Sequence, residues 1–265
     1  MDLHLQGKII IVTGGAKGIG EGIVRMLAAE GAVPVIFGRN QQDNERLVAD
    51  LKKEGLTAEH VVAELNDAPA CKGAVQQVID RFNRIDGVVN NAGYNDGVGL
   101  ENGDYEKFVL SLHRNLVHYY LVVHYALPEL KKVSGPIVNI SSKTGETGQG
   151  NTSGYAAANG GRNALTREWA VELLKYRIRV NAIVVAECWT PQYANWIENF
   201  DNAEEMKKKI TANIPLENRM TTTAEIASMA CLLLSDQSSH TTGQIIHVDE
   251  GMYISTGRSR MPSEY

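Results

Sequence analysis

The chain has few of the features that mark secreted, metal-bound or membrane proteins. Its 265 residues contain only three cysteines, and no two of them form a CxxC pair, so we expect neither a disulfide framework nor a zinc site. No stretch approaches the roughly 18 apolar residues of a membrane-spanning helix, and the first residues lack a basic segment followed by an apolar core. We therefore expect a cytoplasmic protein with reduced thiols, no metal and no membrane partner.

The chain also lacks a basic region that would attract a phosphate polymer. Its formal net charge is −5 and its 26 Lys and Arg residues are scattered, which argues against a nucleic-acid partner. It contains no low-complexity segment, no Pro/Gly/Ser linker and no repeat with a period of about 20 to 50 residues. With 43% hydrophobic and 22% charged residues, we expect one globular domain over residues 1–265.

Short β-branched runs alternate along the chain with amphipathic stretches of helical length. The expected strands are 8–12, 33–37, 61–62, 87–90, 136–140, 179–185 and 245–248. Strands joined by helices pair in parallel through right-handed crossovers and carry helices on both faces. The sequence thus predicts an α/β fold, a doubly wound Rossmann domain with a mostly parallel seven-stranded sheet. Residues 190–215 interrupt the alternation, and we expect a helical insertion there.

A glycine-rich turn follows the first expected strand and opens the first expected helix. Gly14, Gly18 and Gly20 occur in the run TGGAKGIG. Glycine permits a tight turn and a close approach of the backbone to a pyrophosphate, while the helix offers its free N–H groups. We therefore predict a dinucleotide site at this turn that includes Lys17 and Ile19.

Four motifs, in this order and spacing, resemble those of the short-chain dehydrogenase/reductase family. They are the glycine turn, Asn90-Asn91-Ala92-Gly93, Asn139-Ile140-Ser141-Ser142, and Tyr155 thirteen residues after Ser142. With later matches at 179–181, 190–191 and 248–251, the resemblance covers about residues 7 to 252. It implies a nicotinamide dinucleotide and a small-molecule substrate.

The resemblance also implies a homotetramer assembled through the helices that carry Asn115 and Tyr155. Tyr119, Tyr120 and Trp169 fall on these expected helices. They either supply the apolar surface for that contact or face the sheet.

The end of the second strand bears on which coenzyme is bound. An acid there would bond the ribose hydroxyls and repel a 2′-phosphate, but the sequence has Arg39 instead, whose planar fork suits a phosphate. Lys17 adds a second base, so we expect NADP(H) in preference to NAD(H). By resemblance, the remaining coenzyme contacts are Glu64, Leu65, Asn91, Ala92, Gly93, Tyr155, Asn159, Cys188 and Thr190.

The catalytic residues also come from the resemblance. It implies that Ser142 orients the substrate oxygen, that Tyr155 exchanges a proton with it, and that Asn115 holds a water in a proton relay. The family places a lysine four residues after the tyrosine, where its charge lowers the tyrosine pKa and its ammonium binds the nicotinamide ribose. This chain has Asn159 at that position, an amide that can bond a ribose but carries no charge.

Three explanations of Asn159 stay open. A cation from elsewhere, such as Lys143 or Arg162, could substitute; the site could work slowly, or better as a reductase; or the protein could bind coenzyme without turnover. A second departure follows the sixth strand, where Val185-Ala186 replaces the family's Pro-Gly, so the loop could differ locally.

The expected substrate pocket mixes polar groups with indole rings. We expect the loops 91–99, 143–154 and 187–200 to line it, with the candidate residues Ser142, Glu146, Gln149, Glu187, Trp189 and Trp196. Such a mixture suits a sugar or polyol, and residues 186–191 resemble sugar dehydrogenases of the L-fucose dehydrogenase type. The prediction is an NADP(H)-dependent oxidoreductase that transfers a hydride between nicotinamide and a secondary alcohol, carbonyl or sugar hemiacetal. The alternative is a catalytically silent dinucleotide-binding homologue.

Overall fold

A seven-stranded sheet forms the centre of the computed structural model, which describes residues 1–200 and 202–255. Its strand order is β3-β2-β1-β4-β5-β6-β7, and every neighbouring pair is parallel. The strands are β1 (Ile9–Thr13), β2 (Val33–Gly38), β3 (Glu59–Val62), β4 (Gly87–Asn90), β5 (Ile137–Ser142), β6 (Val180–Val185) and β7 (Ile245–Val248). The predicted Rossmann fold is confirmed, with a sheet that is wholly rather than mostly parallel.

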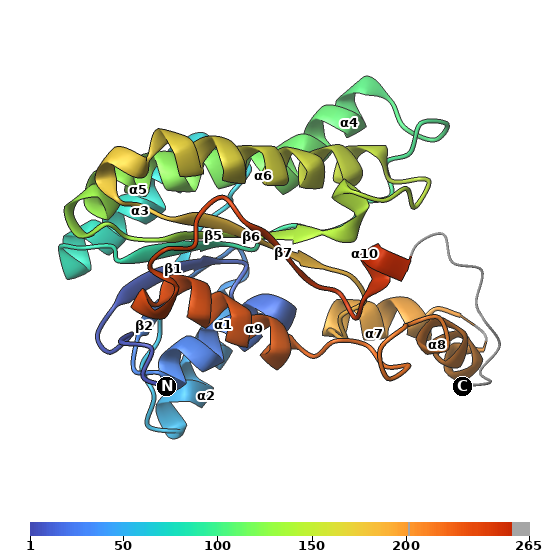
Figure 1. Ribbon diagram of the computed structural model, residues 1–265, viewed down its shortest axis with the longest axis horizontal. Coiled ribbons are helices and arrows are strands. Elements are labelled where there is room, and N and C mark those ends of the chain that lie inside the picture. Colours follow the sequence, from blue (N-terminus) through green and yellow to red (C-terminus); the bar gives the residue numbers. More distant parts are fainter. Residues whose placement is uncertain (201, 256–265) are drawn as a thin grey trace.

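Helices cover both faces of the sheet (Figure 1). One face carries α1 (Gly18–Ala29), α2 (Gln41–Lys53) and α9 (Thr223–Leu234); the other carries α3 (Ala68–Phe82), α5 (His118–Val133) and α6 (Ser153–Glu172). The shorter helices are α4 (Tyr105–Leu112), α7 (Pro191–Glu198), α8 (Ala203–Thr211) and α10 (Met252–Ser255). α7 and α8 occupy the segment 190–215 and extend beyond the sheet in Figure 1. Within the described ranges, no helix is both long and apolar enough to cross a membrane.

The core forms two layers because side chains alternate along each strand. In β1, Ile10 and Val12 join the apolar cluster beneath α1 and α9, whereas Ile9 and Ile11 join the cluster beneath α3, α5 and α6. All five residues of β1 are buried, as expected of a parallel strand covered on both faces.

The aromatic side chains considered for subunit contacts fall into two groups. Tyr119 and Trp169 are buried in the cluster beneath α5 and α6, so these two face the sheet and are unavailable to another subunit. Tyr120 is half exposed and stacks on His124. Of the three, only Tyr120 presents its ring to the outside.

A buried chain of polar groups ties the middle of the sheet to α6. The Asn90 amide donates to Asn139 Oδ1 at 3.0 Å, and the Asn139 amide donates to the Thr166 hydroxyl at 2.9 Å. Thr166 in turn donates to the backbone oxygen of Arg162. Because buried polar groups are costly when unpaired, this network fixes α6 relative to β4 and β5.

Candidate active site

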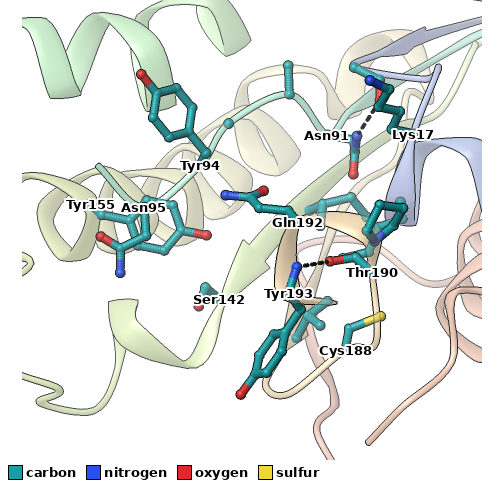
Figure 2. A pocket seen from close by; sticks show the side chains of 18 of the residues that line it. Lys17, Asn91, Tyr94, Asn95, Ser142, Tyr155, Cys188, Thr190, Gln192 and Tyr193 are labelled. Atoms are coloured by element: carbon teal, nitrogen blue, oxygen red, sulfur yellow. Dashed lines mark hydrogen bonds between the residues drawn. The ribbon is translucent and has the colours of Figure 1, made fainter. Parts of the chain in front are cut away.

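A cavity of about 1550 Å³ opens at the edge of the sheet where the strands end. Loops after β1, β2, β4, β5 and β6 line it, which is where open parallel sheets bind ligands. Figure 2 shows Ser142 and Tyr155 within this cavity, with Thr190, Gln192 and Tyr193 from the α7 segment beside them. The cavity is therefore built from segments that are far apart in the sequence.

The glycine turn has the backbone shape that a pyrophosphate requires. Gly14 and Gly18 have φ angles of +63° and +57°, which side chains with a Cβ rarely adopt. α1 begins at Gly18, and its N-cap residue, Lys17, caps none of the first N–H groups with its side chain. These free donors at a helix N-terminus on the cavity wall fit a dinucleotide diphosphate.

Gly20 has a different role, because it does not line the cavity. A Cβ there would overlap the backbone oxygen of Gly14 and the amide of Asn91, so the glycine lets α1 approach the turn. Asn91 braces the same turn by donating to the backbone oxygens of Thr13 at 3.0 Å and Gly14 at 3.2 Å. Its neighbours Ala92 and Gly93 lie on the cavity wall with it.

Basic groups gather where β2 ends. Arg39 is exposed, lines the cavity, and has no carboxylate partner in the part of the chain that the structure describes. Lys17 also lines the cavity, but its ammonium lies 2.7 Å from the Asp43 carboxylate. Glu64 and Leu65, which follow β3, also line the cavity. Of the two predicted bases, Arg39 is the one whose charge is not offset by an adjacent acid.

Ser142 and Tyr155 reach the cavity from different elements. Ser142 is the last residue of β5, and its Oγ accepts from the Thr144 amide at 3.3 Å and the Thr144 hydroxyl at 3.1 Å. Tyr155 lies in the first turn of α6 and is partly exposed. Both residues belong to the wall of one cavity.

Asn115 lies in a π-helical turn, His113–Val117, between α4 and α5. Such turns concentrate at functional sites. Its side chain is held on both ends: Oδ1 accepts from the Tyr94 amide at 2.8 Å, and the amide donates to the Ser111 oxygen at 3.1 Å. Its backbone oxygen accepts from Arg162 Nε at 2.7 Å. Asn115 is wholly buried behind the wall, and its partners Tyr94 and Arg162 both line the cavity.

Asn159 is not on the cavity wall, contrary to its expected place beside the coenzyme ribose. It is fully buried, its amide donates to the Tyr155 backbone oxygen at 2.8 Å, and its Oδ1 accepts from Arg162 Nη1 at 2.9 Å. Arg162 does line the cavity although it is only 3% exposed. The Asn159 side chain thus points away from the cavity, toward the guanidinium of Arg162 one helical turn further along α6.

A charged group faces the α7 side of the cavity. Lys143 forms an ion pair with Glu187, and the Tyr193 hydroxyl donates to the other Glu187 oxygen at 2.7 Å. Burial and the neighbouring Glu187 raise the pKa of Tyr193, so its hydroxyl stays protonated. Since Lys143 is already paired, it is not a free cation for Tyr155.

The loop after β6 needs no left-handed residue. None of residues 185–188 has a positive φ, so Val185 and Ala186 occupy it without strain. Cys188 is buried on the cavity wall, and burial raises the pKa of its thiol to about 12, so the thiol stays protonated near neutral pH.

Two expected substrate residues do not line the cavity. Glu146 is bound instead by His247 at 2.7 Å and Asn163 at 2.9 Å, because η2, a 3-10 turn over 143–145, carries it toward β7. Trp189 lies outside with Lys207 over its ring, and begins an aromatic ladder through Tyr193, Trp196 and Phe200. Gln149, Glu187 and Trp196 line the cavity as expected.

Three further wall residues lie in the loops 91–99 and 187–200, which the sequence argument placed at the pocket without naming these residues. Tyr94, Asn95 and Gln192 line the wall, and Asn95 accepts from the Thr152 hydroxyl at 2.7 Å. They follow the Asn91–Gly93 and Thr190-Pro191 motifs directly, so their place in loops after strands was the available signal. Among the described residues, no group of three or more His, Cys, Asp or Glu side chains could hold a metal ion.

Comparison with known proteins finds relatives over nearly the whole chain. Residues 14–253 match a family described as enoyl-(acyl carrier protein) reductase. The chain is 31% identical to the 3-oxoacyl-acyl-carrier-protein reductase FabG of Thermotoga maritima, covering 95% of this chain and all of that one. It is also 31% identical to the L-fucose dehydrogenase of Bos taurus, covering 97% and 94% of the two chains. The crystal structure of Cj0485 dehydrogenase superposes with a TM-score of 0.92 at 43% identity, covering 98% and 99%.

Proposed function

This chain belongs to the short-chain dehydrogenase/reductase family of nicotinamide-dependent oxidoreductases, and from that premise we propose that it is an NADP(H)-dependent sugar dehydrogenase. Its reaction would transfer a hydride between the nicotinamide and a secondary alcohol, a carbonyl or the hemiacetal of an L-fucose-like aldose. The observation that carries the proposal is that the glycine turn and the hydroxyls of Ser142 and Tyr155 line one cavity.

The preference for NADP(H) over NAD(H) rests on the end of β2. No acid stands there to repel a 2′-phosphate, and the exposed guanidinium of Arg39 is unpaired in the described part of the chain. The partial neutralisation of Lys17 by Asp43 leaves Arg39 as the main determinant.

The chain's own residues stabilise the charge on the substrate oxygen and exchange a proton with it. The bound coenzyme supplies the hydride or accepts it. Ser142 donates a hydrogen bond to the substrate oxygen, and Tyr155 gives a proton to that oxygen in reduction or takes one in oxidation. Thr144 bonds Ser142 Oγ and thereby fixes its position at the end of β5.

The substrate class follows from the α7 side of the cavity. The Lys143–Glu187 pair and the Tyr193 hydroxyl offer donors and acceptors for several hydroxyls, while Trp196 offers an apolar ring for a C–H face. The name of the bovine relative, L-fucose dehydrogenase, supports a sugar, whereas the name of FabG supports a 3-oxoacyl group. The density of charged and hydroxyl groups favours the sugar.

The silent homologue remains the second candidate, because Asn159 carries no charge. The two are separated by initial rates with NADP⁺ and NAD⁺ across L-fucose and related aldoses, and by coenzyme binding in titration calorimetry. We expect turnover that favours NADP⁺ and falls at least about 100-fold in Tyr155→Phe and Ser142→Ala. Coenzyme bound without turnover on any sugar or 3-oxoacyl substrate would instead identify a silent homologue.

A further inference from the structure

Arg162 is a buried cation with neutral partners. It is 3% exposed, and its guanidinium donates to the backbone oxygens of Asn115 and Ile140 at 2.7 and 3.2 Å and to Asn159 Oδ1 at 2.9 Å. In the described part of the chain no carboxylate lies within ion-pair distance of it. Burying a charge without a counter-charge is strongly destabilising, so its presence calls for a role that a neutral residue could not fill.

The guanidinium is directed at the cavity beside Tyr155. Arg162 lines the cavity, and its Nη2 is buried without a hydrogen-bond partner. Its Cζ lies 5.9 Å from the centre of the Tyr155 ring and 4.4 Å from that of Tyr119. Gly93 leaves the room for this approach, because a Cβ at Gly93 would lie 2.6 Å from Nη2.

Asn159 has the chemistry needed to seat this arginine. Its Oδ1 accepts from Nη1, while its amide is anchored on the Tyr155 backbone. A lysine at 159 would lose that acceptor and would place a second positive charge within one helical turn of the guanidinium. The two residues therefore form a matched pair.

Three other basic groups on the cavity wall are paired, neutral or packed against another ring. Lys143 is paired with Glu187. His118 lines the cavity, but burial and the charge of Arg162 lower its pKa to about 3, so its ring is neutral. Arg114 also lines the cavity, where its guanidinium lies 5.8 Å from the centre of the Tyr94 ring.

We propose that Arg162 supplies the positive charge that stabilises the Tyr155 oxygen as its proton moves, and that Asn159 and the backbone oxygen of Asn115 position it. This rests on the proposed function, since it requires Tyr155 to exchange a proton. In reduction the Tyr155 O–H bond breaks and its electron pair stays on the phenolate oxygen. The proton forms the new substrate O–H, the reduced coenzyme supplies the hydride, and water later returns a proton to Tyr155.

The first experiment compares Arg162→Gln and Arg162→Lys with wild type under saturating coenzyme and sugar. The Coulomb energy of two unit charges about 6 Å apart, at an effective dielectric constant of about 20, corresponds to roughly a hundredfold change in rate. We expect kcat of Arg162→Gln to fall by about that factor, with KM changed far less, and Arg162→Lys to recover part of the loss. The matched control is Arg167→Gln, an exposed arginine on the same helix, which should retain wild-type kcat.

Chemical rescue separates charge from packing. In Arg162→Ala, millimolar guanidinium should raise kcat at least tenfold, whereas urea, a neutral molecule of nearly the same shape, should not. Coenzyme binding by calorimetry confirms that each variant is folded. Asn159→Lys should lose activity, because it removes the acceptor of Arg162 and adds a like charge.

The outcomes distinguish this inference from the proposed function. An active wild type whose Arg162→Gln variant keeps more than about a third of kcat, or whose Arg162→Ala variant is rescued equally by urea, overturns the role of Arg162 and leaves the proposed function intact. An inactive wild type that binds coenzyme refutes the proposed function. A gain of activity in Asn159→Lys would then show that Arg162 does not replace a missing cation.

Discussion

Replacing Arg39 by alanine should shift the coenzyme preference from NADP⁺ toward NAD⁺. The guanidinium lies at the end of β2 on the cavity wall, exposed and without a carboxylate partner in the described residues. A charge-assisted hydrogen bond contributes about 1.5 to 3 kcal/mol, and exposure to solvent places Arg39 at the lower end. A loss of about 1.5 kcal/mol corresponds to roughly a tenfold fall in kcat/KM for NADP⁺.

The assay measures kcat/KM for both coenzymes with one sugar at a fixed concentration. The value for NAD⁺ should stay within about twofold, because NAD⁺ has no phosphate for Arg39 to bind. Lys17→Ala is the matched control. Its ammonium is already 2.7 Å from Asp43, so we expect a smaller loss for NADP⁺, about threefold or less. An equal fall for both coenzymes in Arg39→Ala, or a larger effect at Lys17, would refute the assignment.

Three further perturbations test the cavity and its support. Glu187→Gln should raise KM for the sugar about tenfold with kcat little changed, because it removes the carboxylate that Lys143 and Tyr193 share. Initial rates measure both constants, and a fall confined to kcat would contradict this expectation. Burial lowers the His118 pKa from 6.5 to about 3, so between these pH values the unfolded chain binds more protons and the folded state loses stability as the pH drops. His118→Gln should therefore reduce the difference between the unfolding free energies measured in urea at pH 7.5 and pH 5. An unchanged difference would count against this role of His118. Gly93→Ala should destabilise the fold by about 2 to 3 kcal/mol, because the new Cβ meets Arg162 and Asn115. In the same denaturant titration the control Gly97→Ala should cost about 1 kcal/mol, because nothing lies within 4 Å of its new Cβ.

Repeating patterns in the sequence made the fold predictable. β-branched runs such as residues 9–13 are buried on both faces, and this continuous apolar character is what a covered parallel strand requires. The glycine turn could also be predicted from the sequence, because Gly14 and Gly18 adopt backbone conformations that other residues avoid.

Side-chain direction was harder to foresee. Glu146 follows Ser142 closely, yet a single 3-10 turn carries it to His247 on β7. Asn159 is one turn from Tyr155 on α6, but its amide turns inward because Arg162 and the Tyr155 backbone satisfy it. Periodicity gives the face of a helix, while the partners of a buried polar group come from distant segments.

The α7 aromatic ladder gives this protein a built-in optical reporter. Of its three tryptophans, Trp189 and Trp196 lie on the segment that borders the cavity and are partly exposed to water, while Trp169 is buried beneath α5 and α6. The solvent-sensitive part of the intrinsic emission therefore comes from one short segment. A spectral shift on adding a ligand would signal movement or drying of that segment, without any label attached to the chain.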